Sequence, residues 1–160
     1  MAYTTINKPN TQMNTVLYTG NGSTQSITGV NFQPDFTWIK DRDSTAVHYL
    51  FNAVSGATKF TNSDQTYAEQ TNTQSLKSFD TDGFTLGTMT GANNNTNNFA
   101  SWNWKAGGTA VSNTDGDITS SVSANTTSGF SVATYTGNGT GSATVGHGLG
   151  VAPAFVIIKC

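Results

Sequence analysis

The sequence contains a long internal repeat. The motif YTGNG at residues 18–22 recurs at 135–139, and the motif PxFxxIK at 34–40 recurs at 153–159. The two copies lie about 117 residues apart, which is too long for a solenoid repeat of about 20–50 residues and is typical of tandem units. We therefore expect one complete unit followed by the beginning of a second, which runs as far as Cys160.

Each copy of the repeat predicts a strand, a tight turn and a second strand. Asn and Gly in TGNG tolerate the positive φ that a tight hairpin requires, and apolar residues precede the motif in both copies. The proline of PxFxxIK begins a strand, where its missing N–H costs least. The expected organisation is a complete β-sandwich over residues 1–107, a Ser-, Thr- and Gly-rich linker with at most one strand over 108–129, and the first hairpin of a second unit over 130–160.

Two segments between the copies alternate as half-buried strands do. In FTLG, Phe84 and Leu86 point to one side. In FASWNWK, one side carries Ala100, Trp102 and Trp104, and the other carries Ser101, Asn103 and Lys105. We expect the aromatic side to face the core. In the alternative interpretation, Trp38, Trp102 and Trp104 form a platform on which a sugar ring stacks.

The composition favours strands and excludes several classes of partner. Charged residues make up 10% of the chain, and Glu69 is its single glutamate, whereas about 25% charged residues is usual. Helices supported by Glu–Lys pairs are not expected, and Thr-rich strands with Gly and Asn turns fit better. The formal net charge of −2 offers no basic surface to nucleic acid. No apolar stretch reaches signal-peptide or membrane-spanning length, so we expect synthesis in the cytoplasm without membrane insertion.

The sequence predicts neither an enzyme nor a metalloprotein. It has no nucleophile elbow, no phosphate loop and no helix-borne His pair. The two histidines and Cys160 are too few for a zinc site, and the paired aspartates at 80–82 and 115–117 lack the further ligands of a calcium loop. We expect no catalytic residue, no cofactor and no metal ligand. The enzymatic alternative is a glycosidase that uses Glu69 and a nearby aspartate.

Several segments together resemble a known family. YTGNGSTQSITGVNFQPDFTWIK, SFDTDGFTLG, WNWKAGGTA and YTGNGTGSATVGHGLGVAP are similar to a repeated domain of virion and tail-fibre-like proteins of marine bacteriophages, notably cyanophages. The resemblance spans essentially the whole chain. It implies a virion component with an antiparallel β-sandwich of the jelly-roll, concanavalin- or laminin-G-like type, in agreement with the strand-rich composition. In that family the second unit usually runs on into a full domain.

This resemblance implies a non-enzymatic structural protein of a phage virion, most directly a tail-fibre or appendage component for assembly and host adhesion. The expected partners are other virion proteins, further copies of the chain in a homo-oligomer, and a glycan of the host surface. The expected location is the virion, after synthesis in the host cytoplasm. The alternatives are a capsid decoration or head-appendage protein, and a carbohydrate-binding module of a host-recognition protein.

Two surfaces are candidates for these contacts. The loop GANNNTNNF at 91–99 is expected to be exposed, and its host-facing residues are Asn93, Asn94, Asn95, Asn97 and Asn98. The second surface is the uncharged, strand-forming segment Phe155, Val156, Ile157 and Ile158. Because a lone hairpin is marginal in water, we expect this edge to pair with a neighbouring subunit. The second unit would equally be incomplete in a shortened gene product, or in a chain that is a piece of a longer protein.

Overall fold

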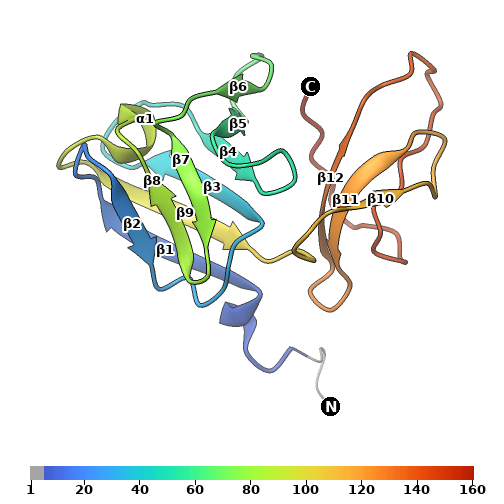
Figure 1. Ribbon diagram of the computed structural model, residues 1–160, viewed down its shortest axis with the longest axis horizontal. Coiled ribbons are helices and arrows are strands. Elements are labelled where there is room, and N and C mark those ends of the chain that lie inside the picture. The colour runs from blue at the N-terminus through green and yellow to red at the C-terminus, as the bar shows by residue number, and fades with distance from the viewer. Residues whose placement is uncertain (1–5) are drawn as a thin grey trace.

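The protein is a β-sandwich followed by a small third sheet (Figure 1). The computed structural model describes residues 6–160. The larger sandwich sheet has the strand order β1 (Met13–Thr19), β9 (Asn98–Trp104), β3 (Phe36–Asp41), β4 (Tyr49–Asn52), β5 (Lys59–Thr61) and β6 (Gln70–Thr71). The facing sheet has the order β2 (Gln25–Thr28), β8 (Gly83–Leu86) and β7 (Leu76–Asp80). All neighbouring strands are antiparallel, which confirms the predicted all-β antiparallel sandwich.

The hydrophobic core lies between the two sandwich sheets. It is formed by buried side chains from both layers: Ile27, Ile39, Phe51, Phe60, Leu76, Phe84, Leu86, Ala92 and Phe99. The ring of Tyr18 stacks on Phe99 with centroids 5.1 Å apart, and burial raises the pKa of its hydroxyl well above the ordinary value. The placement of Phe84 and Leu86 in the core is confirmed. The first part of the chain also contains two short helices, η1 (Pro9–Thr11) and α1 (Thr90–Asn93).

The orientation of β9 is the reverse of the prediction: the polar side of the strand faces the core, and the tryptophan side faces outward. Ser101 and Asn103 are fully buried in the sandwich interior, whereas Trp102 and Trp104 are half-buried on the outer face of the sheet. A period of two decides which residues share a face, but it does not decide which face is inner. The polar side is tolerated inside because its groups are paired. Thr37 Oγ1 donates to Asn103 Oδ1 at 3.0 Å, and Asn103 Nδ2 donates to the Ser101 hydroxyl at 3.1 Å.

The first TGNG motif connects the two sandwich sheets. β1 pairs with β9, and β2 pairs with β8 in the facing layer, so the predicted hairpin between β1 and β2 is not formed. Gly22 does take a positive φ of 66°, as a turn glycine is expected to do. Turn residues specify a reversal of the chain, but they do not specify that the next strand pairs with the previous one.

Residues 108–129 contain more structure than a linker. β10 (Val111–Asn113) and β11 (Ser120–Asn125) form a three-stranded sheet with β12 (Phe130–Tyr135), located beyond one end of the sandwich (Figure 1). The prediction of a linker with at most one strand is therefore wrong. The small residues that suggested a linker permit close packing instead, because a Cβ at Gly107 would collide with the main-chain oxygen of Ala124.

An aromatic cluster joins the third sheet to the sandwich. The ring of Phe130, at the start of β12, lies 5.9 Å from Trp104 and 6.0 Å from Phe36. The Phe36 and Trp104 rings lie 5.5 Å apart on the outer face of the larger sandwich sheet. Apolar rings in contact across the junction stabilise one orientation of the third sheet relative to the sandwich.

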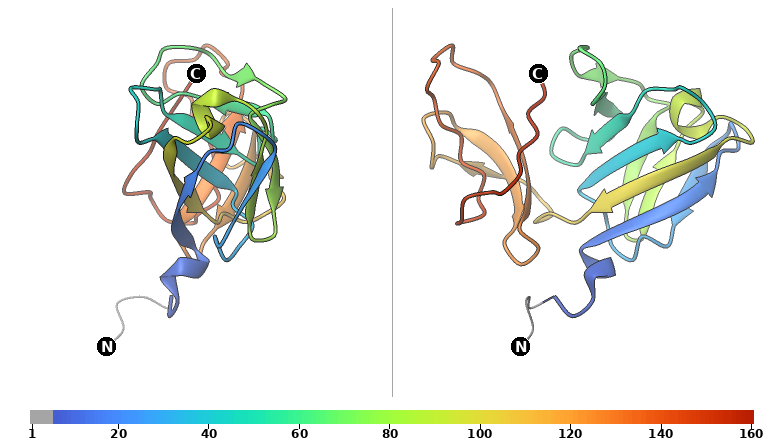
Figure 2. Two further views of the ribbon diagram at one scale, coloured as in Figure 1. Left: turned by 90° about the vertical axis from the view of Figure 1, so that its left-hand side faces the viewer. Right: turned by 180° about the vertical axis from the view of Figure 1, so that it is seen from behind.

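The second PxFxxIK motif forms no strand. Residues 153–159 follow an irregular path near the C-terminus, which lies between the third sheet and the sandwich (Figure 2). In the first copy the motif forms β3, which is paired on both edges by β4 and β9. Among the described residues no strand pairs with 153–159. The predicted second strand is therefore wrong for the isolated chain, because the backbone groups of a strand need a partner ladder.

Candidate functional site

One residue of the predicted contact loop is a buried structural amide. Asn93 is only 1% exposed and ends α1. Its Oδ1 accepts from the main-chain N–H of Asn21 at 3.0 Å, and its Nδ2 donates to the main-chain oxygens of Ser23 and Gly87 at 2.6 and 2.8 Å. Asn93 thus fastens the first TGNG motif to the loop. The assignment of Asn93 as an exposed contact residue is therefore wrong. The sequence could not show this, because a run of asparagines carries no periodicity that would reveal an inward side chain.

Asn97 and Asn98 are held by two aspartates at the end of β3. Asn97 Nδ2 donates to Asp41 Oδ2 at 2.8 Å. The main-chain N–H and the Nδ2 of Asn98 both donate to Asp43 Oδ2, at 2.7 and 2.9 Å. Asn98 is exposed, but its amide oxygen also accepts from Thr19 Oγ1 at 3.2 Å. These two asparagines hold the loop together, and their hydrogen-bonding groups are largely engaged within the chain.

Asn94 and Asn95 form the outward part of the same loop. Asn95 is exposed and Asn94 is partly exposed. Neither side chain has a hydrogen-bond partner within residues 6–160. Their amides are therefore free to bind an external group, and the assignment of these two residues to host contact stays a prediction.

The carboxylate of Asp41 is a buried structural anion. The residue is 3% exposed, and burial alone would raise its pKa. Hydrogen bonds from the Ser44 hydroxyl, the Asn97 amide and the Asp43 N–H, together with the charge of Lys40, outweigh burial and lower the pKa of Asp41 below its ordinary value. A general acid at neutral pH requires a raised pKa, so this group is suited to holding the loop and not to proton donation.

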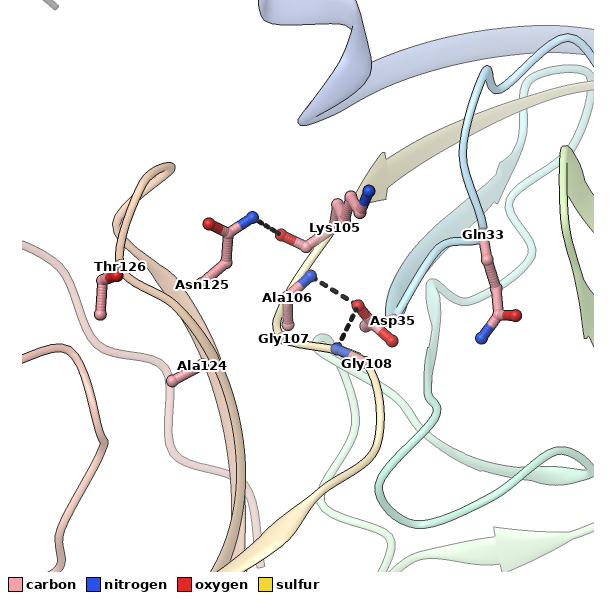
Figure 3. Close-up of a pocket in the computed structure, with 9 residues that line it drawn as sticks. All are labelled: Gln33, Asp35, Lys105, Ala106, Gly107, Gly108, Ala124, Asn125 and Thr126. Carbon is pink, nitrogen blue, oxygen red and sulfur yellow. Dashed lines mark hydrogen bonds between the residues drawn. The ribbon is translucent and has the colours of Figure 1, made fainter. Parts of the chain in front are cut away.

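A cleft of about 470 Å³ lies where the third sheet meets the sandwich (Figure 3). Asp35, which is 2% exposed, accepts hydrogen bonds from the main-chain N–H groups of Ala106 at 2.7 Å and Gly108 at 3.4 Å. From the other side, Asn125 Nδ2 donates to the main-chain oxygen of Lys105 at 3.3 Å. These bonds fix the chain where it leaves β9. The cleft is therefore a structural joint between the two parts of the molecule.

An aromatic pair lies on the outer face of the larger sandwich sheet. Trp38 on β3 and Trp102 on β9 are opposite each other in the ladder, with ring centroids 6.3 Å apart and planes at 72°. Trp38 Nε1 donates to His48 Nδ1 at 2.8 Å, so the neutral His48 ring carries its proton on Nε2. Among the described residues, Figure 2 shows no layer of strands or helices over β1, β9 and β3 on this side. The face combines aromatic rings with a ring N–H donor, which suits a sugar.

The predicted assembly segment exposes four contiguous apolar side chains. The exposed fractions are 79% for Phe155, 60% for Val156, 52% for Ile157 and 72% for Ile158. The equivalent residues of the first copy, Phe36, Thr37, Trp38 and Ile39, are buried or half-buried. The segment is thus fully available to a partner, and its role in assembly stays a prediction.

The described residues contain no cluster suited to a metal. In residues 6–160 no three His, Cys, Asp or Glu side chains converge as a metal site requires. Glu69, the carboxylate of the enzymatic alternative, forms a partly exposed ion pair with Lys59 at 3.6 Å. Within the same range no helix has the length and apolar character needed to cross a membrane.

The sequence interpretation missed the roles of Asp35 and His48. Asp35 stands between the proline and the phenylalanine of the first PxFxxIK motif, where the second copy has Ala154. That difference between the copies was the one signal for Asp35. His48 offered none, because its partner Trp38 is brought to it by the pairing of β3 with β4.

Comparison with known proteins places the chain in a family. Residues 8–160 match the family model of a domain of unknown function, DUF7483, so the chain belongs to this family. The match extends through both copies of the repeat and through the third sheet. No curated protein and no solved structure matches the chain. The fold and the family together define an all-β sandwich protein of the DUF7483 family.

Proposed function

We propose that the protein is a non-enzymatic structural component of a phage virion, most directly a tail-fibre or appendage subunit. The observation that carries the proposal is the contiguous apolar surface at residues 155–158. Side chains of this kind in solvent mark a surface for protein interaction. The virion context comes from the resemblance of the repeated motifs to marine phage proteins. In this role the chain joins other virion proteins, forms homo-oligomers and contacts the host surface.

The electrostatics of the chain support a structural role. The formal net charge is −2, and Asp41, an aspartate with little exposed surface and a lowered pKa, serves to fasten a loop. Loops held by hydrogen bonds on a sandwich scaffold give fixed surfaces for binding. Adhesion through such surfaces depends on shape and hydrogen bonds and requires no chemical step.

The test is to locate the protein in purified phage particles. We expect mass spectrometry to find it in the particles and immunogold electron microscopy to label the tail or its fibres. Labelling distributed over the capsid would replace the fibre assignment by the capsid decoration alternative. Absence of the protein from purified particles would contradict a virion role.

A second candidate function is glycan binding on the outer aromatic face. The observation that favours it is the Trp38–Trp102 pair beside the donor on His48. We expect the protein to retain a host surface glycan on an array and Trp102→Leu to weaken this retention about tenfold, as the loss of one stacking partner predicts. The control Leu17→Ala changes an exposed residue of the same sheet without an aromatic ring. Equal retention by both variants would contradict this function.

A further inference from the structure

We infer that β12 and residues 153–159 together accept one extended strand that resembles β9, supplied by a partner outside residues 1–160. The inference rests on the proposed assembly function and specifies the partner's chemistry. It starts from the first unit, where β9 lies between β1 and β3 and pairs with both. The first unit therefore shows what arrangement the two repeated segments adopt when their partner strand is present.

The second unit contains equivalents of the two outer strands of this arrangement. Tyr135 of β12 corresponds to Tyr18 of β1, and Phe155 corresponds to Phe36 of β3. In the first unit, β1 and β3 are not neighbours in the sheet, because β9 separates them. In the second, the one described strand that pairs with β12 is β11, and β12 lies at the edge of its sheet. The strand missing from the described part is the equivalent of β9.

The side chains of 153–159 fit the same strand arrangement. Thr37 and Ile39 of β3 point into the core and are 0% exposed. Their equivalents Val156 and Ile158 are β-branched and lie in solvent, and β-branched residues pack well on a pleated surface. The segment therefore has strand-forming side chains, and what it lacks is a backbone partner. Adding a strand to an open edge supplies main-chain hydrogen bonds, while alternate side chains give specificity.

A second copy of the chain does not supply this strand from its own β9. That strand is paired on both edges and contributes Phe99 to the core, so its withdrawal would disrupt the first unit. The occupant is instead a separate strand of the same chemistry: seven uncharged residues that combine three aromatic rings with small and asparagine side chains. Charge does not oppose its binding, because β12 has no charged residue and 153–159 has only Lys159.

The experiment titrates the 160-residue protein into a fluorescent peptide with the sequence NNFASWNWK, which is that of residues 97–105. We expect saturable one-to-one binding by fluorescence anisotropy, with slower hydrogen exchange at 130–135 and 155–158. A matched peptide with proline at the position of Ser101 lacks one N–H and cannot form a regular central strand. We expect it to bind about tenfold or more weakly, since it loses main-chain pairing.

Two protein variants make this experiment specific. The double variant V156K/I158K changes two exposed side chains and is expected to weaken peptide binding about tenfold or more, because charges oppose strand addition at an edge. The control Leu17→Lys places a single lysine on an exposed position of β1 and is expected to bind the peptide as the unmodified protein does. Binding that persists in the double variant, or equal binding of the proline peptide, would overturn the inference.

Self-association of the protein provides a further outcome. The protein could form a concentration-dependent dimer that is lost in V156K/I158K but is not dissociated by the peptide. This result would assign the surface to a second copy and overturn the inference. The virion proposal is tested separately by particle localisation. A particle-bound protein that does not bind the peptide keeps the assembly function and loses this partner. A protein that binds the peptide but is absent from particles keeps the strand site and loses the virion assignment.

Discussion

The two copies of PxFxxIK have similar sequences and opposite environments. In the first copy, Ile39 lies on a central strand and is 0% exposed, whereas its equivalent Ile158 is 72% exposed. The difference lies in their neighbours. β4 and β9 pair with the first copy, while no strand of the described residues pairs with the second. A motif with strand propensity becomes a strand only where other segments complete its backbone hydrogen bonds.

The TGNG motifs differ in the same way. In the first copy, the N–H groups of Asn21 and Gly22 both donate to Asn93, one to its side chain and one to its main-chain oxygen. In the second copy, the motif forms a local hydrogen bond from the Thr140 N–H to Asn138 Oδ1 at 2.9 Å, and residues 136–139 are exposed. Tertiary contacts therefore fix the first turn, and local contacts alone shape the second.

The largest expected effect compares the same substitution in both copies. Ile39→Ala removes buried apolar atoms and leaves a cavity, so we expect it to lower the free energy of unfolding by about 2–5 kcal/mol. Ile158→Ala acts on an exposed side chain and should change it by less than about 0.5 kcal/mol. Denaturant unfolding of both variants measures the difference. Equal losses would show that the second copy is packed in solution.

The next effect concerns the amide that fastens the first TGNG motif. Asn93→Ala leaves the Asn21 N–H and the carbonyl groups of Ser23 and Gly87 without their partner, and we expect a loss of about 3 kcal/mol. Asn95→Ala in the same loop is the control and should change stability by less than about 0.5 kcal/mol. Thermal unfolding followed by circular dichroism checks the pair. A stable Asn93→Ala protein would contradict the structural role.

A smaller effect is expected where the copies differ in sequence. Asp35→Ala gives the first copy the residue of the second and removes the acceptor of the Ala106 and Gly108 N–H groups. We expect a loss of about 2 kcal/mol and faster proteolysis between β9 and β10. The reverse change, Ala154→Asp, affects an exposed position and serves as the control. If both variants resist proteolysis equally, Asp35 does not fix the joint.

The smallest effect is the dependence of folding stability on acid pH that Asp41 adds to the first copy. The equivalent residue in the second copy is Cys160. The folded pKa of Asp41 is lowered relative to an unfolded value of about 3.9. The carboxylate therefore stabilises the fold fully above about pH 4, and this contribution, about 1 kcal/mol, is lost as the pH falls through the folded pKa. Asp41→Asn should flatten the stability profile below about pH 4. An unchanged acid limb, measured by urea unfolding at each pH, would exclude this contribution.

Several elements of the fold could be predicted from local sequence. The Thr-, Asn- and Gly-rich composition predicted an all-β protein, the proline of the first PxFxxIK motif predicted the start of β3, and the alternation in FASWNWK predicted β9. These inferences succeeded because strand propensity, turn conformation and the period of two depend on residues close together in the chain. Of the candidate site, the exposure of residues 155–158 was predicted, although as the edge of a hairpin strand that these residues do not form.

The tertiary structure alone decided which face of β9 is inner, which asparagine of the 91–99 loop is buried and which copy of the repeat forms a strand. Thr37 meets Asn103, and Asn93 meets Asn21, across 66 and 72 residues of sequence. Polar groups are buried only where such distant partners satisfy their hydrogen bonds, and a strand persists only where distant strands pair with it. The sequence determined the local preferences of both copies, and long-range pairing decided which copy could realise them.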